Sequence, residues 1–466
     1  MTGRKENTLA LTALSDAFGE RLITSSAVRQ HHGCDESWHS PTLPDAVLMA
    51  HCTEDVVTAV KICAKYQLPV IPFGIGSSLE GQVIPLEGGL SIDFTEMSKV
   101  LEIRPEDFDV TVQPGVTRKQ LGRELRDVGL FFSVDPGADA TLGGMTSTRA
   151  SGTTSVRYGT MSDNVISLTV VTPDGRVVRT ASRSRKSSAG YDLTHLYVGS
   201  EGTLGVITEI TLRLHPVPEA VSAAVVSFPD MESAVSAVVT TLQYAVPIAR
   251  IELLDEQTVD AVNQYMKTDH PVQPTLFLEF HGSESGVKEQ AELVGDVCQE
   301  FGGGDFVWKT LEEDRNALWE ARHNGALAAM SLRPGRELLS TDVCVPISRL
   351  AEAIAEAKAD LLENDIYAAL MGHVGDGNFH FVIPMDRSNN EEMTKIKAFC
   401  DRLAQMAIKM DGTCTGEHGI GIGKQPLLEL EMGDGVDLMR SIKKVLDPDN
   451  IMNPGKIFNG IAGSSS

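Results

Sequence analysis

Apolar and polar residues alternate with two different periods between residues 43 and 72. The apolar runs AVLM and LPVIPF are short, whereas the stretch between them repeats its apolar residues with helical spacing. Glu54 and Asp55 precede that stretch, where acidic residues favour the first turn of a helix. The pattern predicts a strand, a second strand, and between them a helix whose apolar face is formed by Val56, Val57, Val60, Ile62 and Cys63.

Short β-branched runs dominate residues 89–215. They are LSIDF, VTVQPG, ISLTVVTPDGRVV and GVITEITLRLHP, and glycine-rich connectors separate them. Pro173-Asp174-Gly175 is a turn sequence inside the third run. This zone is predicted to be rich in strands and to have long glycine loops.

The pattern changes after Pro216 to Pro218, which mark a domain boundary. Beyond it, AAVVSFPDMESAVSAVVTTLQ and PTLFLEFHGSESGVKEQAELVGDVCQEFG each predict a strand followed by an amphipathic helix. Near its end the chain is predicted to be helical up to Asp447-Pro448 and irregular through Asn453-Pro454-Gly455. Together with the length of 466 residues, these patterns predict an α+β protein of two or three domains.

Charge and composition narrow the class of protein. Lysine plus arginine number 40 and aspartate plus glutamate 64, so the formal net charge is −24, which argues against nucleic acid or an anionic membrane as the main partner. The seven cysteines form no C-x-x-C pair, so reduced thiols and a reducing compartment such as the cytoplasm are expected. The sequence lacks a signal peptide pattern and a long apolar run, so no transmembrane segment is predicted, and peripheral membrane contact stays open.

Three loops rich in glycine and hydroxyl residues need an explanation, because ordering glycine is entropically unfavourable. They are PFGIGSSLEGQ, VDPGADATLGGMTSTRASGTTSVRYG and YVGSEGTLGVITEI. The first is not a dinucleotide fingerprint, since Leu79 occupies the third glycine position, and GIGIGK at 419–424 lacks the Ser or Thr that completes a P-loop. Two interpretations remain at this point, backbone N–H groups that cradle an extended phosphorylated ligand or a loop-rich β domain.

The stretch MGHVGDGNFHF places His373 and His380 at the two ends of a glycine-rich segment. Gly375 and Gly377, with polar neighbours, predict a tight turn, and the two histidines would then lie close together across a hairpin. Facing imidazoles can be metal ligands, but a zinc, manganese or iron site usually has a third protein ligand. Two structural histidines fit the segment equally.

Eight motifs, in order, carry a resemblance to a known family: PFGIGSSLEG, DPGADATLGGMTSTRASGTTSVRYG, GSEGTLGVIT, ARHN, STDVCVP, GHVGDGNFH, CTGEHGIGIGK and LDPDNIMNPGKIF. The chain resembles the FAD-dependent D-2-hydroxy-acid dehydrogenases of the vanillyl-alcohol-oxidase fold, and within them the cytochrome-linked D-lactate dehydrogenases and the glycolate oxidase flavoprotein subunits. The resemblance covers residues 43–458. It implies a PCMH-type FAD-binding domain with two subdomains at 1–216, an α+β substrate or cap domain with an antiparallel sheet and a metal site at 217–424, and a helical segment at 425–466 that returns to the FAD domain.

The resemblance implies which residues hold FAD. The first loop would contact the pyrophosphate, the second the isoalloxazine and ribityl chain, and the later positions the adenine side and the flavin domain. The implied residues are Pro72, Gly74, Ile75, Gly76, Ser77, Ser78, Pro136, Gly137, Gly143, Gly144, Ser147, Ser151, Gly152, Tyr158, Gly202, Ile207 and Asn453. Relatives that tether the flavin through the first loop have a histidine there, whereas this chain has Gly-Ile-Gly-Ser-Ser, so non-covalent FAD is predicted.

The resemblance also implies a divalent metal, zinc, manganese or iron, whose ligands are equivalent to His373, His380 and Glu417. Chelation of the carboxylate and C2 hydroxyl of a 2-hydroxy acid would orient the substrate and lower the hydroxyl pKa. His418 would then accept the hydroxyl proton as general base, and C2 would release hydride to flavin N5 to give a 2-oxo acid. Arg322 would pair with the substrate carboxylate, and Asn378 would hydrogen-bond the substrate.

One departure from the family pattern narrows the substrate. The D-2-hydroxyglutarate dehydrogenases have a lysine just before the aspartate of the STDVCVP region, whereas this chain has Leu339-Ser340-Thr341-Asp342. Without that cation a second substrate carboxylate would be poorly compensated, so D-lactate is favoured, followed by longer aliphatic D-2-hydroxy acids and glycolate.

Several alternatives remain open at the level of sequence. They are a D-2-hydroxyglutarate dehydrogenase, a glycolate oxidase flavoprotein subunit, a metal-free flavin oxidase of a sugar or phenol, and a flavoprotein subunit with an assembly role. Because a nicotinamide fingerprint is missing, the expected electron acceptor is a cytochrome, a quinone or an electron-transfer flavoprotein. A homodimer is among the expected assemblies. The expected location is the cytoplasm, with peripheral contact at the inner membrane left open, and a eukaryotic source would favour the mitochondrial matrix.

Overall fold

The computed structural model describes residues 2–459, with side chains from residue 7 onward. The chain divides into two compact units. Unit 1 comprises Met1–Ser151, Thr160–Val217 and Glu417–Ser466, and unit 2 comprises Gly152–Gly159 and Pro218–Gly416. Residues 152–159 and the segment from Glu417 onward therefore each leave the unit of their preceding neighbours in the sequence.

A four-stranded sheet of unit 1 contains the predicted strand–helix–strand unit. β2 (Ala46–Met49) and β3 (Val70–Phe73) both run parallel to β4 (Leu90–Asp93), which lies between them, and β1 (Leu22–Ile23) pairs antiparallel with β2. α3 (Thr53–Tyr66) connects β2 to β3. The predicted apolar face of α3 is confirmed: Val56, Val60 and Cys63 are buried, and Val57 and Ile62 are partly buried against the same core.

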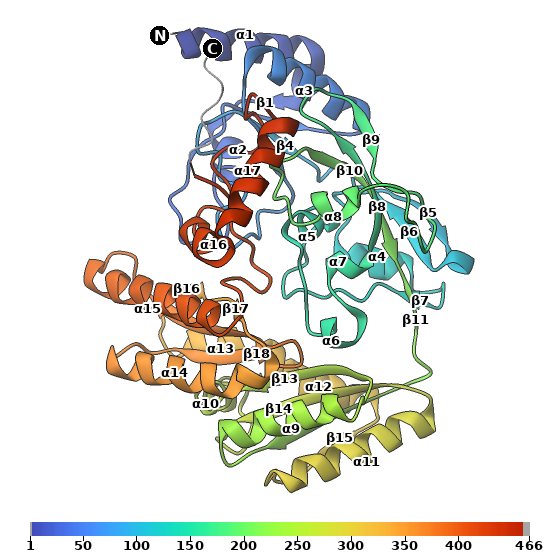
Figure 1. Ribbon diagram of the computed structural model, residues 1–466, viewed down its shortest axis with the longest axis vertical. Helices are drawn as coiled ribbons and strands as arrows, with labels where there is room; N and C mark the ends of the chain where they lie inside the picture. Colours follow the sequence, from blue (N-terminus) through green and yellow to red (C-terminus); the bar gives the residue numbers. More distant parts are fainter. Residues whose placement is uncertain (1, 460–466) are drawn as a thin grey trace. The chain divides into compact units, whose positions relative to one another are not determined.

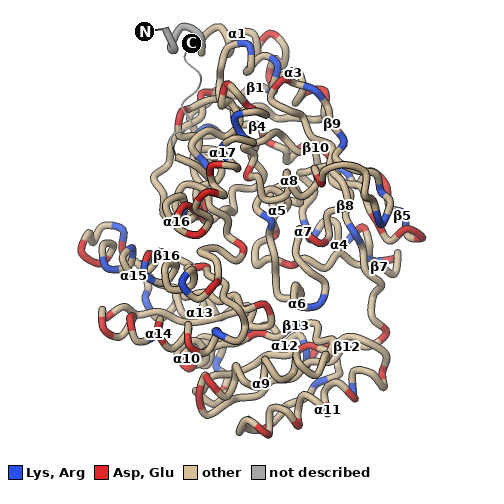
Figure 2. Tube along the Cα trace, in the orientation of Figure 1, with Lys and Arg blue, Asp and Glu red and all other residues tan. Residues whose placement is uncertain are grey.

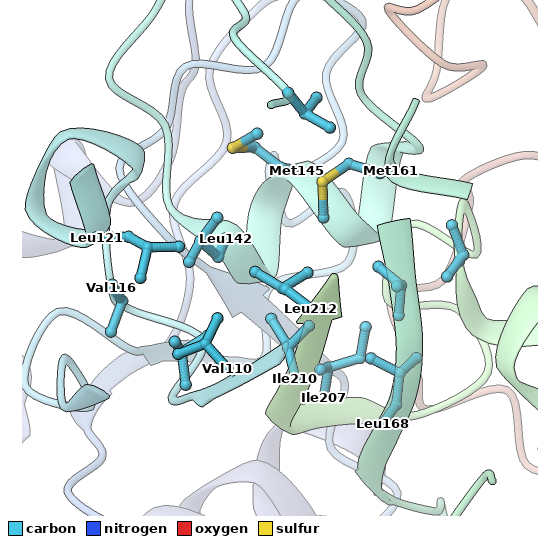
Figure 3. Close-up of a cluster of buried hydrophobic side chains, with 14 of the residues drawn as sticks. Val110, Val116, Leu121, Leu142, Met145, Met161, Leu168, Ile207, Ile210 and Leu212 are labelled. Carbon is cyan, nitrogen blue, oxygen red and sulfur yellow. The ribbon is translucent and has the colours of Figure 1, made fainter. Parts of the chain in front are cut away.

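A second sheet of unit 1 is antiparallel and has the strand order β5-β6-β10-β8-β9, which confirms the strand-rich middle zone. Its apolar face packs against α5 (Leu142–Thr148) and α7 (Met161–Asn164), and Figure 3 shows side chains such as Leu142, Leu168 and Ile210 meeting there. The strands are β5 (Val100–Arg104), β6 (Asp109–Val112), β8 (Val165–Val171), β9 (Val177–Arg179) and β10 (Val206–Arg213).

Segments from the two ends of the chain lie side by side in unit 1 (Figure 1). Val70 in β3 forms a parallel bridge with Met452, beyond the predicted C-terminal helices. The helical prediction is confirmed, because α17 ends one residue before Asp447. The remaining elements of unit 1 are α1 (Thr2–Phe18), α2 (Ser26–His31), α4 (Arg118–Glu124), β7 (Leu130–Phe131), α8 (Leu193–Tyr197), β11 (His215–Pro216), α16 (Gln425–Met432) and α17 (Asp434–Leu446).

Unit 2 is built on an eight-stranded antiparallel sheet with the path β15-β12-β14-β13-β18-β19-β16, and β17 pairs with β19. The two predicted strand–helix pairs are confirmed as β12 with α9 and β14 with α11. The strands are β12 (Ala220–Ser227), β13 (Ile248–Leu254), β14 (Thr275–Gly282), β15 (Val307–Lys309), β16 (Glu337–Ser340), β17 (Val343–Cys344), β18 (Ala369–His373) and β19 (Asn378–Met385).

Helices cover the sheet of unit 2 and bury its apolar side chains. α10 and α13 pack on each other, and a core cluster that includes Leu254, Phe277, Trp319 and Ala328 joins them to the sheet. The helices are α6 (Ser155–Tyr158), α9 (Met231–Gln243), α10 (Glu256–Met266), α11 (Glu284–Glu300), α12 (Glu312–His323), α13 (Gly325–Ser331), α14 (Leu350–Glu363) and α15 (Asn390–Lys409).

Acidic and basic residues are interspersed along both units (Figure 2). All seven cysteines are free thiols, as predicted. Within the described residues, no helix combines the length and the apolar composition needed to cross a membrane.

Candidate active site

The glycine loops of unit 1 meet around the end of β3. A Cβ on Gly74 would lie 2.3 Å from the Thr141 hydroxyl, at the start of α5, and a Cβ on Gly202 would lie 3.1 Å from Pro72. Gly202 has a φ of +73°, so glycine meets both a conformational and a steric demand at this position. A Cβ on Gly137 would meet no atom within 4 Å, so this loop has open space beside its backbone. The structure thus brings together loops that the resemblance assigned to FAD.

Asn453 connects the C-terminal segment to these loops. Its Nδ2 donates to the carbonyl oxygens of Gln82 at 2.9 Å and Glu201 at 2.7 Å, and its backbone N–H donates to Val70 at 2.9 Å. Lys456 donates to the Ile84 carbonyl at 2.6 Å. Asn453 therefore lies at loops that the resemblance assigns to FAD, where its side-chain amide holds two loop backbones.

The other predicted FAD residues divide between the units. Gly143, Gly144 and Ser147 lie in α5, and Ile207 lies buried in the core of unit 1. Ser151 also belongs to unit 1, but Gly152 and Tyr158 belong to unit 2.

Glu201 fixes the segment that carries Glu417 and His418. Its two carboxylate oxygens accept the backbone N–H groups of Ile420 at 2.7 Å and Gly421 at 2.8 Å. Burial raises the pKa of Glu201 to about 7, although these hydrogen bonds favour the ionised form. Glu201 has a positive φ of 52°, so the backbone is strained at this clamp.

Glu417 and His418 themselves make defined contacts in unit 1. Ser151 Oγ donates to Glu417 Oε2 at 2.6 Å, and Gln82 Nε2 donates to the His418 carbonyl at 2.7 Å. Ser151 was predicted as a flavin contact, and the structure places its hydroxyl on the predicted metal ligand. The Glu417 carboxylate and the His418 backbone are thus held from loops that the resemblance assigns to FAD.

His373 and His380 project from one face of the sheet in unit 2. Their strands form a hairpin in which His373 pairs with Asn378 and Met371 with His380, which confirms the predicted proximity. The ring centroids lie 5.5 Å apart, and one nitrogen of each ring lies within 4.8 Å of the other. The predicted tight turn is confirmed as well: Gly377 has a φ of +80°, and a Cβ there would lie 2.1 Å from the Val345 carbonyl oxygen.

Hydrogen bonds fix the tautomers of both imidazoles. His373 Nδ1 lies 2.7 Å from Glu252 Oε1, and His380 Nδ1 lies 2.9 Å from the Thr341 carbonyl oxygen. Both oxygens are acceptors, so both Nδ1 atoms carry the proton and each neutral ring keeps its lone pair on Nε2. This is the donor atom that a divalent cation takes from histidine, so the pair fits a metal site.

Arg322, the predicted partner of the substrate carboxylate, binds a protein carboxylate in the structure. Its Nε and Nη2 donate to Glu252 Oε2 at 2.9 and 2.6 Å. Burial acts to raise the pKa of Glu252, but His373 and Arg322 outweigh it and the net shift is downward. Nη1 points at Met371, whose sulfur lies 3.8 Å away and accepts hydrogen bonds weakly.

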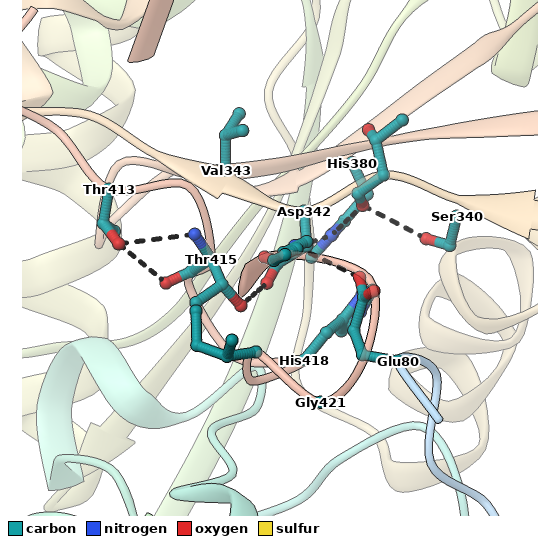
Figure 4. A network of polar contacts seen from close by, with 12 residues as sticks. Glu80, Ser340, Asp342, Val343, His380, Thr413, Thr415, His418 and Gly421 are labelled. Atoms are coloured by element: carbon teal, nitrogen blue, oxygen red, sulfur yellow. Dashed lines mark hydrogen bonds and ion pairs between the residues drawn. The ribbon is translucent and has the colours of Figure 1, made fainter. Parts of the chain in front are cut away.

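Asn378 belongs to a buried polar network with Asp342 and Thr415. Its Nδ2 donates to Asp342 Oδ1 and to the Val343 carbonyl, both at 2.8 Å, and Thr415 donates to Asp342 Oδ2 at 2.7 Å. Figure 4 shows Asp342 next to Thr415. Asn378 Oδ1 is buried without a protein hydrogen-bond partner, so this oxygen can accept a hydrogen bond from a ligand.

A second group of charged side chains, around Glu279, lies on the neighbouring strands of the same sheet. Glu279 on β14 contacts His281 Nε2 at 2.8 Å and Arg250 Nη1 at 3.3 Å, and the Tyr158 hydroxyl lies 2.7 Å from His281 Nδ1. Tyr158 was predicted as a flavin contact. In unit 2 its side chain is held by this histidine.

Sequence patterns did not predict Glu252, Glu201 or Asp342 as site residues. A signal for Glu252 was present, because IARIELL places two charged residues inside an otherwise apolar strand. Glu201 lies among the glycines of its loop, and no other titratable residue near it in the sequence indicated a chemical role. The partners of these residues are far away in the sequence, so the pattern alone did not define their role.

The fold and the loop cluster define a flavin-dependent oxidoreductase. One family model, described as FAD binding domain, matches residues 44–181, and another, FAD linked oxidases, C-terminal domain, matches residues 217–457. The structure is similar to that of p-cresol methylhydroxylase, with a TM-score of 0.80, 20% sequence identity and 97% coverage of both chains. The predicted α+β fold of this flavoenzyme class is confirmed.

Sequence relatives define the family more closely. The chain is 52% identical to the "Probable D-lactate dehydrogenase, mitochondrial" of Danio rerio over 94% of this chain and 89% of that protein. It is 42% identical to the "D-lactate dehydrogenase [cytochrome], mitochondrial" of Arabidopsis thaliana over 96% and 80%. The chain belongs to the FAD-linked oxidase family, and the predicted use of FAD is confirmed.

Proposed function

We propose that the protein is an FAD-dependent dehydrogenase that oxidises D-lactate to the corresponding 2-oxo acid. The observation that carries the proposal is the pair of facing histidines whose Nδ1 atoms are held by acceptors, which sets Nε2 of each ring as the nitrogen that can bind a cation. Membership of the family and the names of the relatives support this substrate class.

His373, His380 and Glu417 are the proposed ligands of a divalent cation, zinc, manganese or iron. Two imidazole nitrogens and one carboxylate suit these ions and leave coordination positions for substrate oxygen atoms. The bound cation would supply Lewis-acid activation of the C2 hydroxyl. The Ser151 hydroxyl, which donates to Glu417, would keep that carboxylate oriented.

Three side chains are proposed to act on the substrate. His418 accepts the C2 hydroxyl proton, and the clamp on its backbone holds it for that task. Arg322 pairs with the substrate carboxylate through Nη1, because Glu252 already occupies Nε and Nη2. Asn378 offers Oδ1 as a hydrogen-bond acceptor. Bound non-covalent FAD supplies the acceptor for the hydride from C2.

The proposed preference for a small substrate rests on residues 339–342. Leu339 is buried and Asp342 is buried and negatively charged, and the segment offers no cation for a second carboxylate. D-lactate is therefore favoured over D-2-hydroxyglutarate.

Anaerobic titration of the purified FAD-loaded protein tests the proposal. D-lactate, L-lactate, glycolate and D-2-hydroxyglutarate are added separately, and the flavin absorbance is recorded. We expect bleaching by D-lactate and none by L-lactate. Bleaching by D-2-hydroxyglutarate alone would contradict the argument from residues 339–342, and bleaching by glycolate alone would identify a glycolate oxidase.

A cytochrome is the proposed electron acceptor, since the Arabidopsis relative is named for one. Both relatives carry the word mitochondrial in their names, so in a eukaryotic cell we propose the mitochondrial matrix. After reduction by D-lactate, the enzyme should pass electrons to cytochrome c faster than to a quinone. The opposite order would contradict this choice of acceptor.

A further inference from the structure

We infer that Glu252 is a positioning residue that uses one carboxylate to align both a metal ligand, His373, and the carboxylate-binding residue, Arg322. The inference rests on the proposed function and adds a residue to it. Glu252 lies on β13, and neither the sequence motifs nor the family resemblance pointed to it.

The carboxylate of Glu252 is fully used by these two partners. Oε1 accepts from His373 Nδ1 at 2.7 Å, and Oε2 accepts from Arg322 Nε and Nη2 at 2.9 and 2.6 Å. Glu252 is 0% exposed and Arg322 is 7% exposed. A buried charge requires compensation, and each of these two side chains supplies it for the other.

The sheet register places Glu252 and His373 together. Leu253 of β13 pairs with Gly372 of β18, so the next residues along the two strands, Glu252 and His373, lie opposite each other. Arg322 reaches the same carboxylate from α12. The strand, and not a mobile loop, thus sets the position of the carboxylate.

A carboxylate at this position determines which nitrogen of His373 can bind a cation. Because Oε1 accepts a hydrogen bond, the proton stays on Nδ1, the lone pair stays on Nε2, and the plane of the ring is fixed. The same carboxylate occupies Nε and Nη2 of the guanidinium, which leaves Nη1 beside the Met371 sulfur, a weak acceptor. Ligand geometry and substrate orientation are therefore coupled through one side chain.

Glutamine at this position would disturb the alignment, although its shape is almost the same. The amide oxygen would face Arg322, which donates two hydrogen bonds, and the amide NH₂ would then face His373 Nδ1. An NH₂ donor there would place the histidine proton on Nε2 and remove the lone pair from the metal side. The reversed amide would point its NH₂ at the guanidinium, which carries no acceptor.

Glu279 provides a matched control on the neighbouring strand. It is also buried, and it also contacts an arginine and a histidine, Arg250 and His281. His281 is not among the proposed metal ligands. Glu279→Gln therefore removes an equivalent buried charge from the same sheet without touching His373.

The test uses the FAD-loaded protein after removal of metal by a chelator. Mn²⁺ is titrated into wild type, Glu252→Gln and Glu279→Gln, and free Mn²⁺ is followed by its EPR signal. We expect Glu252→Gln to bind Mn²⁺ about 10- to 100-fold more weakly than wild type. Glu279→Gln should remain within about twofold of wild type. The KM for D-lactate should rise in Glu252→Gln, because a neutral amide oxygen holds the Arg322 guanidinium more weakly than a carboxylate does.

A second variant keeps the test decisive if Glu252→Gln does not fold. Glu252→Asp retains the charge for Arg322 but withdraws the acceptor from His373, so Mn²⁺ affinity should fall by an intermediate factor.

The inference and the proposed function fail in different ways. A folded Glu252→Gln, or Glu252→Asp if only that variant folds, with wild-type Mn²⁺ affinity would overturn the inference and leave the proposed function intact, provided that D-lactate still bleaches the wild-type flavin. Wild-type protein that binds no Mn²⁺, Zn²⁺ or Fe²⁺ would overturn both the inference and the proposed metal site. Equal losses in Glu252→Gln and Glu279→Gln would show a general structural effect and overturn the specific role.

Discussion

Two buried carboxylates, Glu252 on β13 and Glu201 in the loop before β10, hold the residues proposed for catalysis or the backbone next to them. Glu252 binds a histidine and an arginine, whereas Glu201 binds two backbone N–H groups of the segment that follows His418. Both carboxylates are buried, and an unpaired charge in the protein interior would be strongly unfavourable. The two carboxylates differ in their net pKa shift: the pKa of Glu252 is lowered by its contacts with His373 and Arg322 in spite of burial, and that of Glu201 is raised by burial.

The raised pKa of Glu201 predicts a pH-dependent contribution to stability. A carboxyl whose pKa rises to about 7 on folding contributes fully below its unfolded value, near 4.5, and loses that contribution as the pH rises through about 7. The free energy of unfolding of wild type relative to Glu201→Gln should therefore fall by about 3 kcal/mol or less between pH 5 and pH 8. Lys456, whose pKa burial lowers to about 8, limits the loss while it is protonated.

Urea unfolding of both proteins at each pH measures this difference. Thr203→Val is the control, because it removes a buried hydrogen bond to the Ser200 carbonyl from the same loop but no titrating group. The difference in the free energy of unfolding between Thr203→Val and wild type should be constant between pH 5 and pH 8. A constant offset for Glu201→Gln as well would show that Glu201 does not titrate in the folded protein in this range.

The proximity of His373 and His380 could be predicted from their own segment, but their partners could not. Glycine and polar residues between them specify a tight turn, which is a local property. The acceptors of their Nδ1 protons lie 121 and 39 residues away in the chain. Only the sheet register brings these acceptors to the histidines, and register is not encoded in the motif.

At the scale of elements, the β18–β19 turn sets the spacing of the two histidines. Gly377 has a left-handed backbone, and its Cα lies against the Val345 carbonyl. Gly377→Ala should lower the free energy of unfolding by about 2 kcal/mol or more, from the unfavourable φ and from displacement of the 345 backbone. Metal binding should weaken with it, because both histidines flank the turn.

Thermal and urea unfolding of Gly377→Ala provide the measurement, and Gly295→Ala is its control in the same unit. Gly295 lies inside α11, and a Cβ there would make ordinary contact with Phe306 at 3.7 Å. This change should raise stability by about 0.5–1 kcal/mol, because alanine favours a helix. Equal stability of Gly377→Ala and wild type would mean that the turn tolerates a side chain.

Many of the strands and helices could be predicted from periodicity, whereas their order in the sheets could not. The strand–helix pairs that begin with β2, β12 and β14 follow from local alternation. The position of β13 between β14 and β18, which places Glu252 opposite His373, depends on contacts between distant segments. Local patterns contain no information on such contacts.

At the scale of the whole molecule, the chain crosses between its two units more often than the sequence suggests. Composition marks one boundary near Pro216 to Pro218. Residues 152–159 and the segment from Glu417 onward, however, each belong to a different unit from the residues that precede them in the sequence. As a result, the segments that carry the proposed ligands and FAD contacts are shared between units. Within unit 1, hydrogen bonds of Gln82, Ser151 and Glu201 link the loops assigned to FAD to the segment with Glu417 and His418.

FAD is predicted to bind without a covalent bond to the protein. The first loop has Gly-Ile-Gly-Ser-Ser at 74–78 and no side chain that commonly bonds to flavin, so acid precipitation should leave the pellet colourless and FAD in the supernatant. Free FAD at 100 times its Kd should stabilise the apoprotein by about 2.7 kcal/mol, measured as a higher unfolding midpoint.

A yellow pellet would contradict non-covalent binding, and the structure indicates where to look for the bond. The Cys34 carbonyl oxygen lies 3.7 Å from the position of a Cβ on Gly76, and the ring of His31 lies 5.7 Å from that of Phe73, just before the loop. His32 is a weaker candidate, since both of its ring nitrogens are held, by Val28 and Asp93. Loss of the yellow colour in Cys34→Ala or His31→Ala would identify the attachment residue, whereas a colourless wild-type pellet leaves the glycine loop to bind FAD through hydrogen bonds and packing alone.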